Sequence, residues 1–118
     1  MNPIARMLDM QKKLQIEGIG TDPTELEGEE RTVFIRNMVL ALLDEVHEVL
    51  GEVGWKPWAK SRHVNEERAK EELVDAWHFF MNLMLAVGLT ADELYEGYIE
   101  KNRVNLERWQ SGYTGVSE

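Results

Sequence analysis

The apolar residues of this chain recur every three or four positions along four long stretches, and this period is what most limits the possible folds. Such spacing matches the turn of an α-helix and places the apolar side chains on one helical face. The pattern predicts helices over about residues 3–16, 30–53, 66–87 and 90–110. Neither sustained two-residue alternation nor an Asn-Gly hairpin turn occurs, so strands are not expected. The sequence therefore predicts an all-α fold.

Glycine, proline and one capping pattern are expected to separate these helices. Gly18, Gly20 and Pro23 are predicted to end the first helix, and Gly54 to end the second. Residues 90–93 have the Thr-x-x-Glu spacing of a capping box, which predicts the start of the fourth helix.

The amount of apolar surface predicts how the helices pack. The third helix is apolar nearly all round from residue 77 onward, so we expect it to be the most buried. The fourth is expected to contribute four core residues: Leu94, Ile99, Leu106 and Trp109. At 118 residues the chain suits one domain, residues 1–113, with a flexible tail at 114–118. We expect a four-helix bundle completed by oligomerisation into a homodimer or homotetramer.

The composition argues against several classes of function. With no cysteine, the chain lacks disulfides, thiolate zinc sites and cysteine nucleophiles. A net charge of −9 would repel a duplex nucleic acid. No apolar run reaches the roughly 18 residues that span a bilayer, and the N-terminus does not resemble a signal peptide. We expect a cytoplasmic protein without nucleic-acid or membrane partners.

Two pairs of acidic residues stand three positions apart on consecutive predicted helices: Glu45 with Glu48, and Glu72 with Asp75. Residues at this spacing share one helical face. If the apolar stripes pack together, both pairs border one groove, where their carboxylates would repel each other. Mg²⁺ or Mn²⁺, which prefer oxygen ligands, would relieve that repulsion. Acidic pairs are also common on solvated helices, so a non-catalytic helical interaction module stays an alternative.

The acid pairs resemble the signature of a known superfamily. Asp44-Glu45-x-x-Glu48, then 23 residues, then Glu72-x-x-Asp75 is similar to the pattern of the all-α nucleoside triphosphate pyrophosphohydrolases, which include the MazG-like enzymes and the dimeric dUTPases. The resemblance implies that the four acids bind Mg²⁺, with Mn²⁺ as a substitute. It further implies cleavage of the α–β phosphoanhydride. For the mechanism we expect attack by a metal-bound water that a glutamate activates, with Glu48 or Glu45 as the general base.

Three further segments resemble the dimeric dUTPase branch: Gly54-Trp55-Lys56-Pro57-Trp58, Asp75-Ala76-Trp77-His78-Phe79, and residues 101–113. The resemblance implies four phosphate-binding residues, namely Lys56, Lys101, Arg108 and Tyr113. It also implies five nucleoside-binding residues, namely Gln11, Trp58, His78, Phe79 and Asn105, with Gln15 as an alternative to Gln11 and with Asn102 as a further amide that could read the base. In this interpretation His78 would donate a hydrogen bond to the sugar 3′-hydroxyl.

The resemblance favours hydrolysis of dUTP to dUMP and pyrophosphate. Two departures from the family pattern leave the nucleobase of the substrate less certain than the reaction. The chain is shorter than dimeric dUTPases usually are, and Trp109 separates Arg108 from Gln110 where that family has Arg and Gln adjacent. A MazG-like pyrophosphohydrolase acting on dCTP or on several triphosphates therefore stays open as an alternative.

Overall fold

The computed structural model of the chain describes residues 2–60 and 63–112, which places Tyr113 and the predicted tail 114–118 outside the described residues. Within the described ranges every regular element is helical, and one isolated antiparallel bridge joins Val53 to Val64. The all-α prediction is confirmed. The elements in order are α1 (Pro3–Leu14), the π-helical segment η1 (Gln15–Ile19), α2 (Gly28–Gly51), α3 (Glu66–Val87) and α4 (Ala91–Gln110).

The first helical segment ends later than predicted. Gly18 lies inside η1, and the chain turns only at Gly20, which has a φ of 88°. The N–H groups of Gly20 and Thr21 both donate to the carbonyl of Gln15, at 2.9 and 3.1 Å. Glycine within a helix costs only about 1 kcal/mol relative to alanine. The left-handed conformation at Gly20, not the mere presence of Gly18, therefore ends the segment.

The second helix ends earlier than predicted, at Gly51 instead of near Gly54. The residues after it pair with the segment that leads into α3. The Gly54 N–H donates to the His63 carbonyl at 3.0 Å, and the Asn65 N–H donates to the Glu52 carbonyl at 2.7 Å. This long-range pairing replaces the last helical turn that the local pattern indicated.

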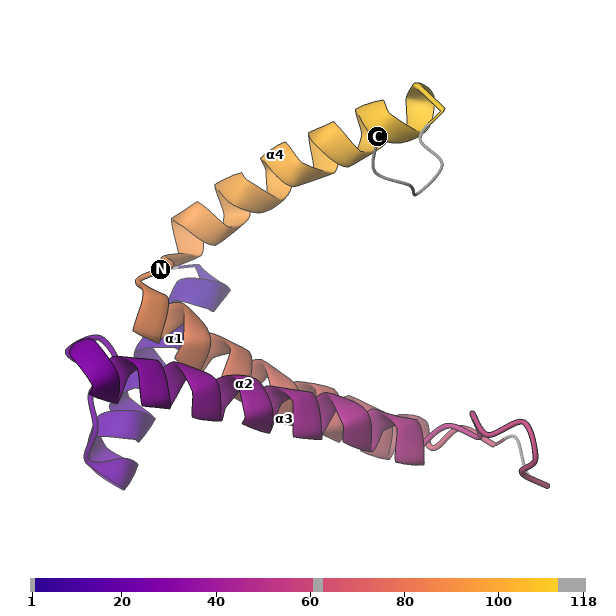
Figure 1. The fold of residues 1–118 in the computed structure, drawn as a ribbon, viewed down its shortest axis with the longest axis horizontal. Helices are drawn as coiled ribbons and strands as arrows, with labels where there is room; N and C mark the ends of the chain where they lie inside the picture. Colours follow the sequence, from indigo (N-terminus) through magenta and orange to yellow (C-terminus); the bar gives the residue numbers. More distant parts are fainter. Residues whose placement is uncertain (1, 61–62, 113–118) are drawn as a thin grey trace.

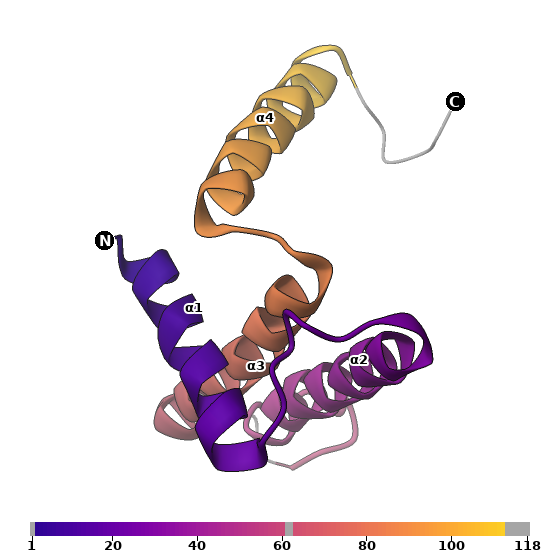
Figure 2. The same cartoon turned by 90° about the vertical axis from the view of Figure 1, so that its left-hand side faces the viewer.

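Helices α2 and α3 form an antiparallel hairpin, and α1 packs across α3 near one end of it (Figure 1 and Figure 2). Helix α4 leaves α3 at an angle of 102° and, among the described elements, its backbone approaches only that of α1. Interactions within α4 stabilise it locally. The Thr90–Glu93 capping box is present, and Arg103 forms ion pairs with Glu100 and Glu107 at 2.6 Å. The hydrogen bond and charge of Glu100 hold the pKa of Arg103 above its usual range.

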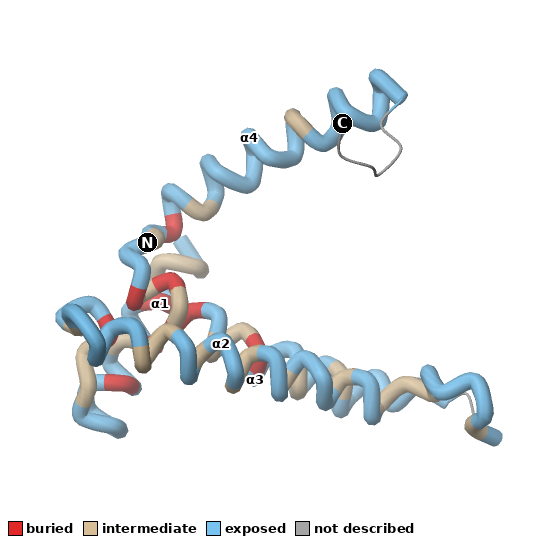
Figure 3. The backbone as a smooth tube through the Cα atoms, viewed as in Figure 1, coloured by how far each residue is buried: buried red, intermediate tan, exposed pale blue. Residues whose placement is uncertain are grey.

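The core lies where α1, α3 and the start of α4 meet (Figure 3). Met84 is 1% exposed and forms a cluster with Leu8, Met81 and Ala91. Helix α3 contributes more buried residues than any other described helix, which confirms the expectation from its apolar composition.

Helix α4 departs from the prediction. Leu94 packs against the core as expected, but Ile99, Leu106 and Trp109 are 50%, 56% and 69% exposed. Because α4 turns away from the hairpin, a single chain does not close a four-helix bundle. The radius of gyration is 17.9 Å, whereas a compact domain of this length would have about 13.5 Å. The exposed apolar face of α4 is consistent with a bundle completed by another chain.

None of the described helices is, by itself, long and apolar enough to cross a membrane. Only α3 and α4 taken together, across their 102° bend, reach that length and composition.

Candidate active site

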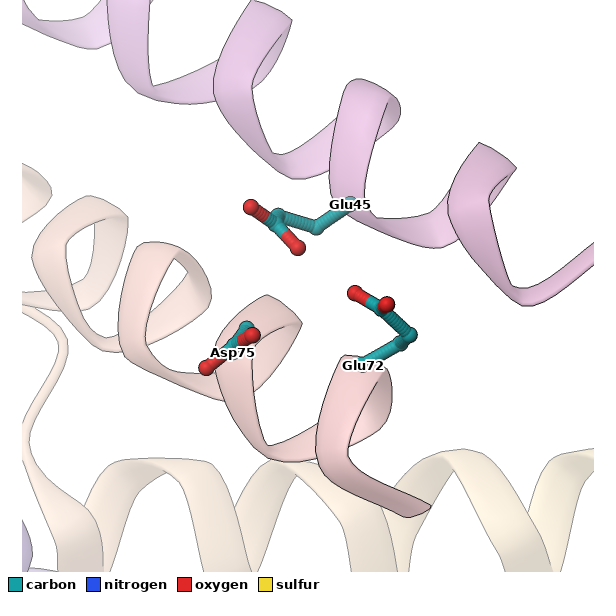
Figure 4. Close-up of side chains that lie close together, drawn as sticks. All are labelled: Glu45, Glu72 and Asp75. Atoms are coloured by element: carbon teal, nitrogen blue, oxygen red, sulfur yellow. The ribbon is translucent and has the colours of Figure 1, made fainter. Parts of the chain in front are cut away.

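Three of the predicted acids meet across the α2–α3 hairpin. Glu45 projects from α2 toward Glu72 and Asp75 on α3 (Figure 4). One carboxylate oxygen of each lies within 4.8 Å of the other two. Glu45 and Glu72 are half-buried and Asp75 is exposed, so the cluster opens to solvent on the Asp75 side. The spacing of three places Glu72 and Asp75 on one face of α3, and the antiparallel packing brings Glu45 over that face.

Glu45 has one carboxylate oxygen whose hydrogen-bonding capacity is unfilled among the described residues. Its Oε2 atom is buried and, among the described residues, has no hydrogen-bond partner. Burial raises the pKa of Glu45, and the charges of Glu48 and Asp75 raise it further. An unsatisfied buried carboxylate oxygen is unfavourable. A positive ion between these acids would satisfy the oxygen and offset the repulsion.

Glu48 adjoins the cluster beside Glu72. A hydrogen bond with Glu48 is the main cause that raises the pKa of Glu72 to about 7, with burial and the charges of Glu48 and Glu45 adding to the shift. Near neutral pH, Glu72 therefore exchanges between its protonated and its ionised form. Three of the four acids singled out in the sequence thus lie in one cluster, and Glu48 lies beside it, close enough to affect the pKa values of Glu45 and Glu72. The oxygen-only donor set of these acids fits Mg²⁺ or Mn²⁺, which are hard cations.

Two arginines tie the hairpin together on either side of the acids. Arg68 Nε donates to Glu52 Oε1 at 3.2 Å, one turn outward from Glu72. Toward the other end, Arg31 Nε donates to the Ala86 carbonyl at 3.0 Å. These bonds join α3 to the C-cap residue of α2 at one end, and join the two helices directly at the other, so they help to fix the spacing of the acids between them.

An apolar cavity opens between α1 and α3. Its volume is about 430 Å³, and its polar lining includes Gln11 and His78. His78 Nδ1 lies 2.7 Å from Gln11 Oε1, so the structure brings together two predicted nucleoside-binding residues from distant parts of the chain. His78 follows Asp75 by three residues and shares its face of α3. The apolar walls are formed by Met7, Met10, Leu14, Val74, Trp77 and Met81.

The remaining predicted residues lie elsewhere. Lys56 and Trp58 are exposed in the α2–α3 loop, where Trp58 contacts Trp55 edge-to-face with ring centroids 6.4 Å apart. Phe79 is half-buried on α3. Helix α4 carries three further residues away from the hairpin (Figure 1): Lys101, Asn105 and Arg108. A single chain therefore does not bring these α4 residues to the acids.

The sequence assigned no role to Asn82, which is 2% exposed. Its Oδ1 accepts a hydrogen bond of 2.9 Å from Gln11 Nε2. An asparagine within the most apolar part of α3 was the available signal, because a buried amide requires polar partners.

Comparison with known proteins identifies the family. A family model described as dUTPase matches residues 3–88, which include all four acids, Gln11, His78 and Asn82. The chain belongs to the dimeric dUTPase branch of the all-α nucleoside triphosphate pyrophosphohydrolases. It is a nucleotide pyrophosphohydrolase and thus a hydrolase of nucleotide metabolism.

Relatives of this pyrophosphohydrolase come from bacteriophages. The chain is 32% identical to a dCTP pyrophosphatase of Enterobacteria phage LZ5, with 96% of this chain and 84% of the relative covered. It is also 32% identical to the dCTP pyrophosphatase of Enterobacteria phage T4, with coverages of 95% and 83%. A DNA replication protein of phage T4 is 30% identical over 86% of this chain but only 34% of its own length. No solved structure gives a significant match.

Proposed function

We propose that this pyrophosphohydrolase is Mg²⁺-dependent and converts a pyrimidine deoxynucleoside triphosphate to its monophosphate and pyrophosphate. The observation that supports this most directly is the convergence of Glu45, Glu72 and Asp75 within 4.8 Å around a buried, unsatisfied Glu45 oxygen. The acids would hold Mg²⁺, with Mn²⁺ as a substitute. When bound, the metal ion would neutralise phosphate charge and make a water molecule more acidic.

The chain's own carboxylates differ in what they can contribute. Glu45 is half-buried, which suits it to holding a cation, whereas Glu48 is exposed and can be reached by water. Glu48 also lies close enough to Glu72 to raise the pKa of that residue to about 7, so it adjoins a group that can exchange a proton at neutral pH. We therefore favour Glu48 over Glu45 as the general base that accepts a proton from the attacking water.

The nucleoside would occupy the cavity between α1 and α3, beside Gln11 and His78. A volume of about 430 Å³ falls within the range of small-molecule sites. The match to the dUTPase model supports dUTP as the substrate. The names of the two phage pyrophosphatases, which align over nearly the whole chain, support dCTP as the second candidate. Both are components of the nucleotide pool, which favours a cytoplasmic location.

We also propose that the active enzyme is a homodimer or homotetramer. The apolar face of α4, formed by Ile99, Leu106 and Trp109, is at least half exposed in one chain. Packing this face against another copy would bury it. It would also offer a route by which Lys101 and Arg108 of one copy reach the phosphates held by the acids of another.

A direct test compares pyrophosphate release from dUTP, dCTP, dTTP, dATP and dGTP, each with and without Mg²⁺. We expect release from dUTP, dCTP or both, and only with the metal. Glu45→Gln should reduce kcat at least about a hundredfold, since charge stabilisation in such sites is commonly of that size. Asp44→Asn is the matched control, because it removes a neighbouring exposed carboxylate outside the cluster. Equal activity of both variants would remove Glu45 from the site, and inactivity toward every triphosphate would favour a non-catalytic module.

A further inference from the structure

A chain of hydrogen bonds runs from α2 through α3 to α1 and back to α3. Asn82 Nδ2 donates to Met38 Sδ at 3.3 Å, and Gln11 Nε2 donates to Asn82 Oδ1 at 2.9 Å. Gln11 Oε1 in turn lies 2.7 Å from His78 Nδ1. Gln11 and Asn82 are 3% and 2% exposed, so water has little access to either amide. We call Met38, Asn82, Gln11 and His78 the amide relay.

The donors and acceptors of the amide relay fit together in only one direction. The Asn82 amide N–H₂ faces Met38 Sδ, a weak acceptor that cannot donate. Asn82 Oδ1 therefore faces Gln11 and must receive a donor, which is Gln11 Nε2. This leaves Gln11 Oε1, an acceptor, facing His78, so His78 Nδ1 must carry the hydrogen. Reversing both amides would place Asn82 Oδ1 against the Met38 sulfur, with no hydrogen between them.

We propose that Asn82 is a positioning residue which, acting through Gln11, fixes the tautomer of His78. In the neutral ring, a hydrogen on Nδ1 leaves Nε2 as an acceptor. His78 then accepts a hydrogen bond from the substrate. This reverses the direction expected from the sequence, where His78 donates to the sugar. The inference rests on the proposed function, in which the nucleoside occupies the cavity lined by Gln11 and His78.

The substrate group that this acceptor recognises is a hydrogen-bond donor of the nucleoside: the sugar 3′-hydroxyl or an N–H of the base. His78 is exposed in the single chain, so the bound nucleoside itself would cover this acceptor. A ligand that covers the acceptor but lacks the donor leaves it unpaired, and the site discriminates against that ligand. Asn82 thereby contributes to nucleoside selection although another side chain stands between it and the substrate.

The tautomer can be measured directly on the full chain. In ¹H–¹⁵N spectra of the His78 ring above the pH at which it is protonated, we expect the protonated-type nitrogen at Nδ1 and the unprotonated-type nitrogen at Nε2. Asn82→Leu should populate both tautomers and move the two resonances toward each other. Met38→Leu, which conserves volume, should move them in the same direction by less. Asn37→Leu is the matched control, because it makes the same substitution at an exposed asparagine outside the amide relay and should leave the tautomer unchanged.

Kinetics supply the second readout. Asn82→Leu should raise KM for the preferred pyrimidine triphosphate about tenfold while kcat changes much less, since outer-shell partners commonly have effects of 10 to 100-fold. If the 3′-hydroxyl is the donor, a 2′,3′-dideoxy substrate should lose affinity in the wild type and lose less in Asn82→Leu. If a base N–H is the donor, that loss should be equal in both proteins, and Asn82→Leu should change the preference between dUTP and dCTP.

Two results would overturn the inference: a wild-type His78 that carries its hydrogen on Nε2, or a folded Asn82→Leu protein with unchanged KM for every pyrimidine triphosphate. The first measurement needs neither a variant nor activity. A chain that shows the expected tautomer but hydrolyses no nucleotide would refute the proposed function and leave the hydrogen-bond assignment intact. Hydrolysis of nucleotides by a chain whose His78 carries its hydrogen on Nε2 would support the proposed function and refute the hydrogen-bond assignment.

Discussion

Binding of Mg²⁺ to the acid cluster should release protons near neutral pH. The pKa of Glu72 is raised to about 7, chiefly by its hydrogen bond with Glu48, and a carboxyl group must lose its proton to bind a metal ion. At pH 7, therefore, about half a proton should leave per site, rising to about 0.9 at pH 6 and falling to about 0.1 at pH 8. The apparent affinity for Mg²⁺ should be about tenfold weaker at pH 6 than at pH 8 for the same reason.

Isothermal titration calorimetry measures this quantity. MgCl₂ is titrated into the full chain at each pH in two buffers with different ionisation enthalpies, and the dependence of the observed heat on buffer enthalpy gives the number of protons released. Glu72→Gln should bind Mg²⁺ more weakly and release almost no proton. Glu71→Gln is the matched control, because it removes the adjacent exposed carboxylate, which lies outside the cluster.

The reasoning fails if the wild type binds Mg²⁺ at pH 7 without releasing protons, or if its affinity is the same at pH 6 and pH 8. Either result would mean that the proton on Glu72 does not compete with the cation. Proton release that persists in Glu72→Gln would instead place the titrating group on another residue.

Three further predictions concern stability and assembly. Without metal, the raised pKa of Glu72 makes the folded state hold a proton that the unfolded chain has already lost. The stabilisation from this proton is complete below about pH 4.5 and is lost as the pH rises through about 7. The Tm should therefore fall between pH 5 and pH 8, and less steeply in Glu72→Gln; an equal slope in both proteins would contradict this. Met84→Ala, at a site 1% exposed, should lower the free energy of unfolding by about 2–5 kcal/mol in urea titrations, whereas Met10→Ala, at a site 61% exposed, should cost much less. Sedimentation should show a dimer or tetramer that Leu106→Asp dissociates; a monomeric wild type would refute the proposed assembly.

The local pattern of the sequence was enough to predict the helices and the acid cluster. Helical period and caps depend on residues within four positions of each other, so α3 begins and ends where the pattern indicated. The two acid pairs followed from the same period, since a spacing of three fixes a shared face whatever the rest of the chain does. Only their approach to each other required an assumption, that the apolar stripes pack together, and the structure confirms it.

Only the tertiary structure determined which hydrogen-bond partners the buried amides have and in which direction α4 runs. The amide relay joins Gln11 to residues 67 and 71 positions away, and no local pattern encodes the side-chain orientation that such a contact requires. The short link between α3 and α4 sets a bend of 102°, which exposes Ile99, Leu106 and Trp109 although their spacing is that of a buried face. Periodicity specifies that a face is apolar, but what covers it depends on packing between segments distant in the chain or on another molecule.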